Sequence, residues 1–509
     1  MKYLLAAEVD KIQELIFQAI RQKEITGGSQ LLTEWCRRMA EEMQRDGVPP
    51  EDIIVADGGA FRVVFSDKEK CRLWGEQLAE YYWRETGGTL TVVEPLQFEE
   101  ADFTVASVEA QRRLRVEKMH PPNASACIHN PFLAYCDICG HGFGSKRESS
   151  EGKTVCSGCS ARFDHIKDIS HSLFVQTLAA DLEINRQVDY FGSFDAHTNV
   201  AYLVADGNNM GVLFSKCSKE QMRKVSLRLP EIIDSSLSTA RVKLINRLIQ
   251  DEKFKIKGLP VLPLIMGGDD LCVLLAAPYS FDFARQFVQH YIDELNAFLA
   301  GIGVRDFAAG MCVGLVVCKA SYPHTLAYKR ASRMLERAKT AARTQGASLS
   351  LISFTKGATA AEEPDKPGKL LNTLQTYHLR DESTGSILPL LDLLECREIL
   401  KDVPGSRLAA IHELYDQAIL PSPNDYDNEK RKDWLKRLDY QLDRAGRKPQ
   451  DRDNLEKALR RLGSADPDFL YMRSAEHIND GIWGTGFGDL MDFWDYTLGM
   501  DIKGKVQDL

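Results

Sequence analysis

Two adjacent aspartates stand at the tip of an apolar hairpin. Residues 267–270 read Gly-Gly-Asp-Asp and separate two apolar runs, 261–266 and 271–275. Glycines allow a tight turn and let a phosphate approach the backbone closely. The carboxylates of Asp269 and Asp270 would repel each other there and raise each other's proton affinity, a cost that a bound divalent cation removes. The pattern predicts a metal site, with a plain solvated turn as the alternative.

A third carboxylate comes from an earlier strand. Asp206 directly follows the apolar run 201–205, and we expect the end of this strand to lie beside the hairpin. Asp206, Asp269 and Asp270 together suit one or two Mg²⁺ or Mn²⁺ ions, which bind hard oxygen ligands and substrate phosphates. One ion would lower the pKa of an attacking 3′-hydroxyl, and another would neutralise the triphosphate and the departing pyrophosphate. The three aspartates predict a nucleotide cyclase or polymerase of the palm type, in which they are the catalytic residues.

We expect the nucleotide to lie against small and polar residues next to these acids, namely Gly207, Asn208, Gly211, Gly267 and Gly268. Lys339, in the basic segment 329–343, could hold the β- and γ-phosphates as a point charge. An ordinary solvated helix lysine is the alternative. Met334, Leu335 and Ala338 would form the buried stripe of the same helix.

Four cysteines predict a structural zinc site. Cys136 and Cys139 form one Cys-x2-Cys pair, and Cys156 and Cys159 form a second after sixteen intervening residues. This spacing supplies four thiolates for tetrahedral Zn²⁺, and a site closed by four protein ligands has no open position for a substrate. We expect the other cysteines outside this region to be packing residues: Cys36, Cys71, Cys217, Cys272, Cys312, Cys318 and Cys396.

The elements that would position these residues occur twice in the same order. Alternating apolar residues and turn residues predict strand–helix–strand–strand–helix–strand near the N-terminus and again from residue 200. The first set is predicted as strands at 2–7, 53–56, 61–65 and 89–93 and helices at 11–45 and 68–85. The second set is predicted as strands at 200–205, 261–266, 271–275, 308–317 and 349–354 and helices at 219–250, 281–299 and 323–343.

A comparison of residues supports an internal duplication. The matching segments are 6–12 on 204–210 and 57–61 on 266–270. This alignment places Glu8 opposite Asp206, and Ala60 and Phe61 opposite the two hairpin aspartates. One carboxylate cannot hold two metal ions, so we expect the first copy to be inactive. It would serve either as a packing partner or as a platform for a second nucleotide.

The predicted fold class is α+β, with two ferredoxin-like palm domains, the first degenerate and the second catalytic. The predicted units are a degenerate palm at 1–119, a zinc-binding insert with connecting helices at 120–198, a catalytic palm at 199–356 and a helical C-terminal domain at 357–509. Within the last unit, residues 430–448 are basic and interleaved with apolar residues. An amphipathic helix with a solvated face explains this pattern, and a contact with RNA or a partner subunit is the alternative.

Composition excludes several classes of protein. The 509 residues carry a formal net charge of −9, which argues against non-specific coating of nucleic acid. Any RNA contact would be local, through the basic segments 329–343 and 430–448. No run of about 18 apolar residues occurs, so we expect no membrane span and a cytoplasmic location. Hydrophobic and charged contents of 44% and 27% are those of a soluble globular protein.

With these residues in view, the chain resembles the large palm-domain (polymerase/cyclase) subunit of type III CRISPR effector complexes. The features that carry the resemblance, over about residues 1–355, are a degenerate palm with Ile12 and Gln13 near Phe17, the four-cysteine element, the run Asp206-Gly207-Asn208-Asn209-Met210-Gly211 and the Gly-Gly-Asp-Asp hairpin. The resemblance implies Mg²⁺-dependent conversion of ATP to cyclic oligoadenylate second messengers in antiviral defence. It also implies guide-RNA and target-RNA complex subunits as partners, and activation by RNA.

Two departures from that family modify the expectation. The family often carries an N-terminal His-Asp nuclease domain, but this chain has no His-Asp dipeptide, so it resembles a reduced member without DNA cleavage. The first-strand motif of the family commonly reads Asp-Gly-Asp, whereas position 208 is Asn here. Metal binding is retained if Asp206 and Asp269 are the ligands.

Two alternatives remain at this point. One is a non-catalytic scaffold or nucleotide-binding subunit of an RNA-guided complex. The other is an enzyme similar to diguanylate cyclases that uses GTP. Diguanylate cyclases generally join two identical catalytic subunits, whereas one chain here supplies two unequal palms.

Overall fold

A computed structural model of the chain describes most of its residues. The described residues are 1–10, 12, 16, 22–119, 134–140, 142–144, 146–147, 152–165, 187–251, 258–346, 348–357, 370–371, 373–381, 387–416, 428–444, 449–464, 472–474 and 483–500. Gln13, Phe17 and residues 445–448, which the sequence analysis mentions, lie outside this set.

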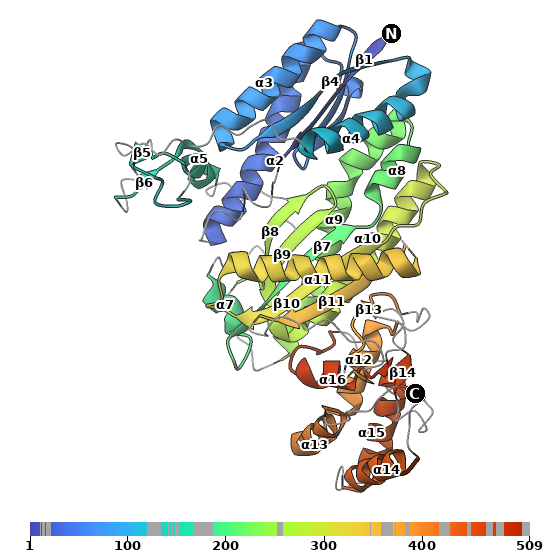
Figure 1. Cartoon of the computed structure of the whole chain (residues 1–509). Coiled ribbons are helices and arrows are strands. Elements are labelled where there is room, and N and C mark those ends of the chain that lie inside the picture. The colour runs from blue at the N-terminus through green and yellow to red at the C-terminus, as the bar shows by residue number, and fades with distance from the viewer. Residues whose placement is uncertain are drawn as a thin grey trace.

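The N-terminal unit that we predicted as a palm, called the first palm below, is an antiparallel sheet with helices on both faces (Figure 1). Its elements are β1 (Lys2–Val9), α2 (Gln22–Arg45), β2 (Ile53–Asp57), β3 (Ala60–Phe65), α3 (Lys68–Thr86), β4 (Leu90–Phe98) and α4 (Phe103–Met119). The strand order is β2-β3-β1-β4. The predicted order of elements is confirmed, and α4 is an additional helix that we did not predict.

Alternation along β1 explains why both faces are covered. Leu5 and Ala7 pack with α2 and α3 in one apolar core, whereas Leu4 and Ala6 pack with α4 in another. Successive side chains of a strand point to opposite faces, so an unbroken apolar strand requires a layer on each side.

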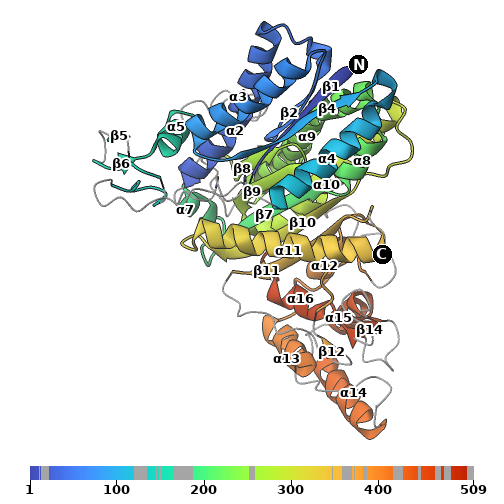
Figure 2. The same ribbon diagram turned by 45° about the horizontal axis from the view of Figure 1, so that its top comes forward.

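The second palm is built on a larger sheet with the order β13-β11-β10-β7-β9-β8. Its elements are β7 (Asn199–Gly207), α8 (Met210–Lys216), α9 (Lys219–Gln250), β8 (Val261–Gly267), β9 (Asp270–Ala276), α10 (Ser280–Gly301), β10 (Met311–Lys319), α11 (His324–Gln345) and β11 (Leu351–Lys356). The predicted strands and helices of this region are all present. α11 crosses one face of the sheet (Figures 1 and 2), while α9 and α10 share the core of the other face.

The central strand β7 carries Asp206 to the functional edge of the sheet. Tyr202 and Val204 point into the core beneath α11, and Leu203 and Ala205 point into the core beneath α9 and α10. The apolar run that we used to predict this strand is therefore buried on both faces. Asp206 is the first acid after that run, and it emerges where the strand ends.

The strand register corrects our alignment of the two palms by one residue. Asp57 pairs with Ala60 across the first hairpin, and Gly267 pairs with Asp270 across the second. Gly59 and Ala60 therefore correspond to the two aspartates, and Phe61 does not. Matching the Gly-Gly pairs by sequence caused the error, because the two hairpins place their glycines differently in otherwise equivalent two-residue turns. The first hairpin still lacks both acids.

The four-cysteine region packs against the first palm. It contains β5 (Lys146–Arg147), β6 (Thr154–Val155) and α5 (Ser157–His165), and α5 contacts α2 and α3. A short helix, α7 (Val188–Gly192), leads into β7. A Cβ on Gly158 would lie 2.4 Å from the carbonyl oxygen of Thr86, so only glycine allows α5 to approach α3 this closely.

The C-terminal region is mostly helical and lies at the opposite end of the molecule from the first palm (Figure 1). Its elements are β12 (Leu370–Leu371), β13 (Tyr377–His378), α12 (Leu390–Ile399), α13 (Gly405–Asp416), α14 (Asn428–Asp443), α15 (Pro449–Leu462), β14 (Arg473–Ser474), β15 (Trp483–Gly484) and α16 (Phe487–Asp492). Two features differ from a purely helical unit: β13 extends the second palm's sheet, and β12, β15 and β14 form a small sheet of their own. Within the described residues, no helix combines the length and apolarity needed to cross a membrane.

Candidate functional site: an aspartate cluster between two palms

The predicted acids meet where β7 and the β8–β9 hairpin end. Asp206 is the direct cross-strand partner of Asp270, and Asp269 precedes Asp270 in the turn. Gly268 has a left-handed backbone with φ of 58°, a conformation that glycine adopts at little cost. The register of three antiparallel strands thus places three carboxylates at one edge.

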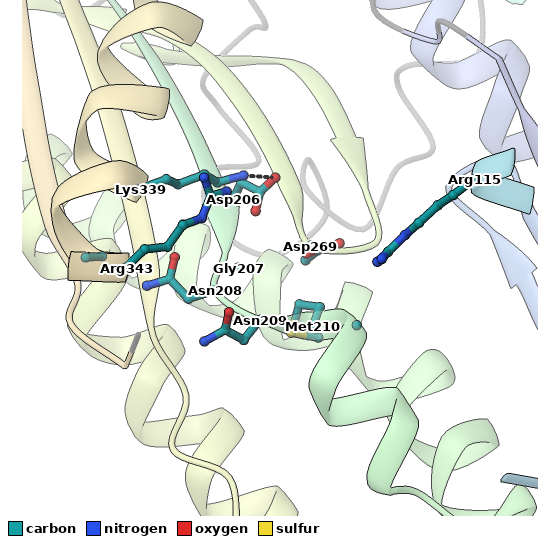
Figure 3. A pocket seen from close by; sticks show the side chains of 11 residues that line it. Arg115, Asp206, Gly207, Asn208, Asn209, Met210, Asp269, Lys339 and Arg343 are labelled. Atoms are coloured by element: carbon teal, nitrogen blue, oxygen red, sulfur yellow. Dashed lines mark ion pairs between the residues drawn. The ribbon is translucent and has the colours of Figure 1, made fainter. Parts of the chain in front are cut away.

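A hollow of about 380 Å³ opens beside these acids (Figure 3). It is lined by Arg115, Asp206, Gly207, Asn208, Asn209, Met210, Gly211, Asp269, Lys339, Ala342 and Arg343. Six of the residues that we predicted for the site lie in its wall: Asp206, Gly207, Asn208, Gly211, Asp269 and Lys339. Gly267, Gly268 and Asp270 lie in the adjoining hairpin, with Asp270 exposed at the tip.

The carboxylates of the hairpin hold protons unusually tightly. Loss of hydration and the nearby charge of Asp206 raise the pKa of Asp269 to about 7. The same causes, together with Asp269 itself, raise the pKa of Asp270 well above its usual value. Crowded acids of this kind gain the most when a cation replaces their protons.

Lys339 forms an ion pair with one acid of this cluster. Its Nζ lies 2.8 Å from Oδ2 of Asp206, and the two side chains are 17% and 23% exposed. Figure 3 shows Lys339 and Arg343 projecting from α11 toward the hollow. The predicted apolar stripe of Met334, Leu335 and Ala338 is buried, and this anchoring aims the opposite helix face at the aspartates.

Arg115 was missed by the sequence argument. It lies on α4 of the first palm and reaches toward the hollow from the far side (Figure 3). Its Nη2 would lie 3.8 Å from a Cβ on Gly211. The segment after β4 has apolar residues at helical spacing, including Phe103, Ala106, Ala110 and Leu114. This pattern indicates a helix, but we did not predict one there. The first palm therefore contributes a cation to the wall of the second palm's site.

Gly207 and Asn208, which we predicted to contact the nucleotide, also stabilise the local fold. A Cβ on Gly207 would lie 3.1 Å from Oη of Tyr291 and 3.2 Å from Cβ of Asp269, so this position packs tightly. Asn208 donates from Nδ2 to the carbonyl oxygen of Leu349 at 2.7 Å, and its own N–H donates to the carbonyl of Gly310 at 2.8 Å. The Asn208 side chain thus fixes the turn after β7, a bond that an ionised aspartate could not donate.

The corresponding acid of the first palm is neutralised by cations. Glu8 lies 2.7 Å from Arg62 and 3.0 Å from Lys118, and Arg62 also donates to Gln111 at 2.6 Å. Burial raises the pKa of Glu8, but Arg62 and Lys118 outweigh this effect and hold the pKa below its usual value. Glu8 is thus paired with two cations, whereas its counterpart Asp206 pairs with Lys339 and lies beside two further aspartates.

The four predicted zinc ligands form a single cluster. The sulfur atoms of Cys136, Cys139, Cys156 and Cys159 all lie within 4.8 Å of one another. A Cβ on Gly142 would lie only 2.8 Å from Cβ of Cys156, so the loop closes around the sulfurs without space for a side chain. Four thiols at this separation could hold zinc. The cysteines that we predicted to be packing residues are all buried.

Comparisons with known proteins concern the second palm and the overall fold. The family described as Cas10/Cmr2, second palm domain, matches residues 199–347. No curated protein sequence matched the chain. The crystal structure of Csm1 in T. onnurineus is similar over 98% of this chain and 69% of its own, with 14% identity and a TM-score of 0.55. A Csm1–Csm4 cassette in complex with pppApApA is similar over 97% and 69%, with 13% identity and a TM-score of 0.56.

The similarity to other structures is more limited in extent. An apo Csm1–Csm4 cassette is similar over 68% of this chain, with 14% identity and a TM-score of 0.46. This chain covers 53% of that structure's chain, or about half of its length. At these identities the structures establish the fold, while the family match identifies the palm that carries the aspartates. Residues 199–347 are similar to the second palm domain of Cas10/Cmr2, and the chain as a whole is similar in fold to Csm1.

Proposed function

We propose that the chain is a Mg²⁺-dependent nucleotidyltransferase that joins ATP into cyclic oligoadenylates. The observation that carries the proposal is the pairing of Asp206 with Asp270 beside Asp269, at the edge of a hollow whose other walls supply Lys339, Arg343 and Arg115. Carboxylates on one side and cations on the other suit a metal-bound triphosphate.

The donor set fits a divalent cation. Asp206, Asp269 and Asp270 offer hard oxygen ligands at a single edge. Loss of hydration and repulsion between the carboxylates raise the pKa values of Asp269 and Asp270, and a bound cation relieves the repulsion. Bound Mg²⁺ or Mn²⁺ would supply Lewis-acid stabilisation of the phosphates. The four-cysteine cluster is proposed to hold a structural Zn²⁺.

The chain's own residues would bind and orient the two reacting groups. In the reaction, the 3′-oxygen of one nucleotide bonds to the α-phosphorus of the next, the bond to the β-phosphate breaks, and pyrophosphate leaves. Lys339, Arg343 and Arg115 would hold the negative phosphates. Asp270, exposed at the hairpin tip, is placed to accept the proton of the 3′-hydroxyl. Gly211 would let the nucleotide approach α8.

The choice of adenine and the biological setting rest on the relatives. One Csm1–Csm4 structure of similar fold contains pppApApA, a linear product that ATP polymerisation would give. By analogy, we propose an antiviral CRISPR effector role in the cytoplasm, activated by guide and target RNA and supported by partner subunits. Exposed basic residues of α11 and α14 are candidate RNA contacts. A GTP-using cyclase is the competing assignment.

Incubation with labelled ATP tests the proposed activity. The purified chain would be incubated with Mg²⁺ or Mn²⁺, with and without guide and target RNA. The control is the double variant Asp269→Ala, Asp270→Ala. We expect oligoadenylate and pyrophosphate from the wild type only. Equal yields from both proteins would refute the assignment of these residues, and no product under any condition would favour a scaffold.

A further inference from the structure

The tip of the aspartate hairpin touches the first palm through two of its backbone N–H groups. β8 is the edge strand of the second palm's sheet, and edge strands present N–H groups that need partners. The N–H of Met266 donates to Oγ of Ser29 on α2, at a long 3.4 Å. The backbone N–H of Gly268 interacts with the carboxylate of Asp57, the last residue of β2, and opposes the rise in the pKa of that carboxyl that burial causes. Both acceptors belong to the first palm.

The two turns are also in direct backbone contact. A Cβ on Gly58 would lie 3.4 Å from the nitrogen of Gly268, and a Cβ on Gly267 would lie 3.6 Å from Cα of Gly58. Ser29 is 9% exposed, so the contact is largely dry on this side. An N–H group that loses its acceptor in such a contact is left without a hydrogen bond at a cost in free energy, and this cost holds the two tips together.

The hairpin needs an external support of this kind. Asp269 and Asp270 repel Asp206 and each other, and a turn at the end of an edge strand opens easily unless it is tied down. A metal or substrate site requires its ligands to be held within fractions of an ångström. Asp57 supplies a fixed acceptor at the turn residue immediately before Asp269.

We propose that Asp57, assisted by Ser29, is a positioning residue that clamps the catalytic turn of the second palm from the first palm. The clamp rests on the proposed function for its purpose, because it keeps Asp269 and Asp270 facing Asp206. It gives the degenerate palm a role in the reaction that requires neither a metal nor a nucleotide of its own. Ser29 contacts the N–H of Met266 in β8, and Asp57 interacts with the N–H of Gly268 in the turn.

Hydrogen exchange and metal binding test the clamp without turnover. In the full-length protein, Asp57→Ala should increase deuterium uptake of the segment 264–272 at least threefold and weaken Mn²⁺ binding at least threefold. Asp57→Asn keeps a side-chain carbonyl that accepts the Gly268 N–H, and it should restore both values to within twofold of the wild type. Ser29→Ala should increase uptake in the same segment to a smaller degree.

Asp102→Ala is the matched control, because Asp102 is an exposed acid at the other end of the same palm's sheet. It should change neither measurement. Unchanged uptake of 264–272 in both Asp57→Ala and Ser29→Ala would overturn the proposal, as would equal effects of Asp57→Asn and Asp57→Ala. Should Asp57→Ala unfold globally, Ser29→Ala and Asp57→Asn decide the question. A wild type that forms no nucleotide product would refute the proposed function while leaving these results to judge the clamp.

Discussion

At the scale of single residues, the proton affinity of each acid separates the two palms. Glu8 is satisfied by Arg62 and Lys118, whereas Asp269 and Asp270 crowd one another and hold protons tightly. The first arrangement stabilises the fold, and the second is costly until a cation binds. Costs of this kind are expected at functional sites.

The raised pKa of Asp269 predicts a stability that depends on pH. The folded protein holds this proton until about pH 7, while the unfolded chain releases it near 3.8. The contribution to stability is therefore complete below the unfolded pKa and is lost as pH rises toward 7. Without added divalent metal, Asp269→Asn should be more stable than the wild type at pH 8 by roughly 1 kcal/mol or more, as measured by denaturant unfolding.

At pH 5 this advantage should shrink, because wild-type Asp269 is then protonated. Added Mn²⁺ should stabilise the wild type at pH 8 and leave the variant little changed. A stability difference that is equal at pH 5 and pH 8 would contradict the assigned pKa.

Asn208 provides a second test at this scale. Asn208→Asp removes the donor to the Leu349 carbonyl and brings a negative charge to it. We expect a loss of about 1–3 kcal/mol in unfolding free energy, measured by chemical denaturation. Asn209→Asp adds the same charge at the neighbouring residue of the hollow and should be less harmful. A stable Asn208→Asp protein with stronger metal binding would show instead that an acid belongs there.

At the scale of elements, the sheet of each palm was predictable and its surroundings were not. The apolar runs 201–205 and 271–275 alternate between two cores, so their strands, and the convergence of Asp206 with the hairpin, followed from pattern alone. The one-residue shift between hairpins did not, because register depends on which residues close the turn. Arg115 was missed because it reaches the site only through the packing of α4 on the first palm.

The placement of α4 predicts a nucleotide contact from the first palm. Arg115→Ala should raise the KM for the nucleotide at least threefold with a smaller effect on kcat, because it removes a phosphate-facing cation without touching the aspartates. Arg112→Ala is the matched control, since Arg112 is an exposed residue of the same helix that pairs with Glu109 at 2.7 Å. Steady-state kinetics of both variants checks this prediction, and equal KM values for both would refute it.

At the scale of the whole molecule, the first palm lies between the four-cysteine region and the aspartate hairpin. α2 contacts both α5 and β8. The four-cysteine region therefore packs against the same helix that carries Ser29. The sequence predicted the cysteine cluster from spacing but could not place it, because its position depends on close contacts such as that of Gly158 with Thr86.

Loss of one zinc-binding thiol should therefore loosen the fold of the four-cysteine region. Cys136→Ser should reduce bound zinc from one ion per chain to less than half of that value, and it should expose 134–165 to protease. Zinc content by atomic absorption and limited proteolysis measure these effects. Cys396→Ser, a buried cysteine outside the cluster, should retain the zinc. Full zinc retention in Cys136→Ser would contradict a four-thiolate site.

The proposed nucleotidyltransferase activity is tested most directly by mass spectrometry of the products formed from an equal mixture of ATP, GTP, CTP and UTP with Mn²⁺ and cognate RNA. We expect oligoadenylates, linear with a 5′-triphosphate or cyclic, from the wild type and none from the Asp269→Ala, Asp270→Ala variant. Guanylate products would assign a different substrate. The absence of any oligonucleotide from the wild type would contradict the central claim that this aspartate cluster catalyses nucleotidyl transfer.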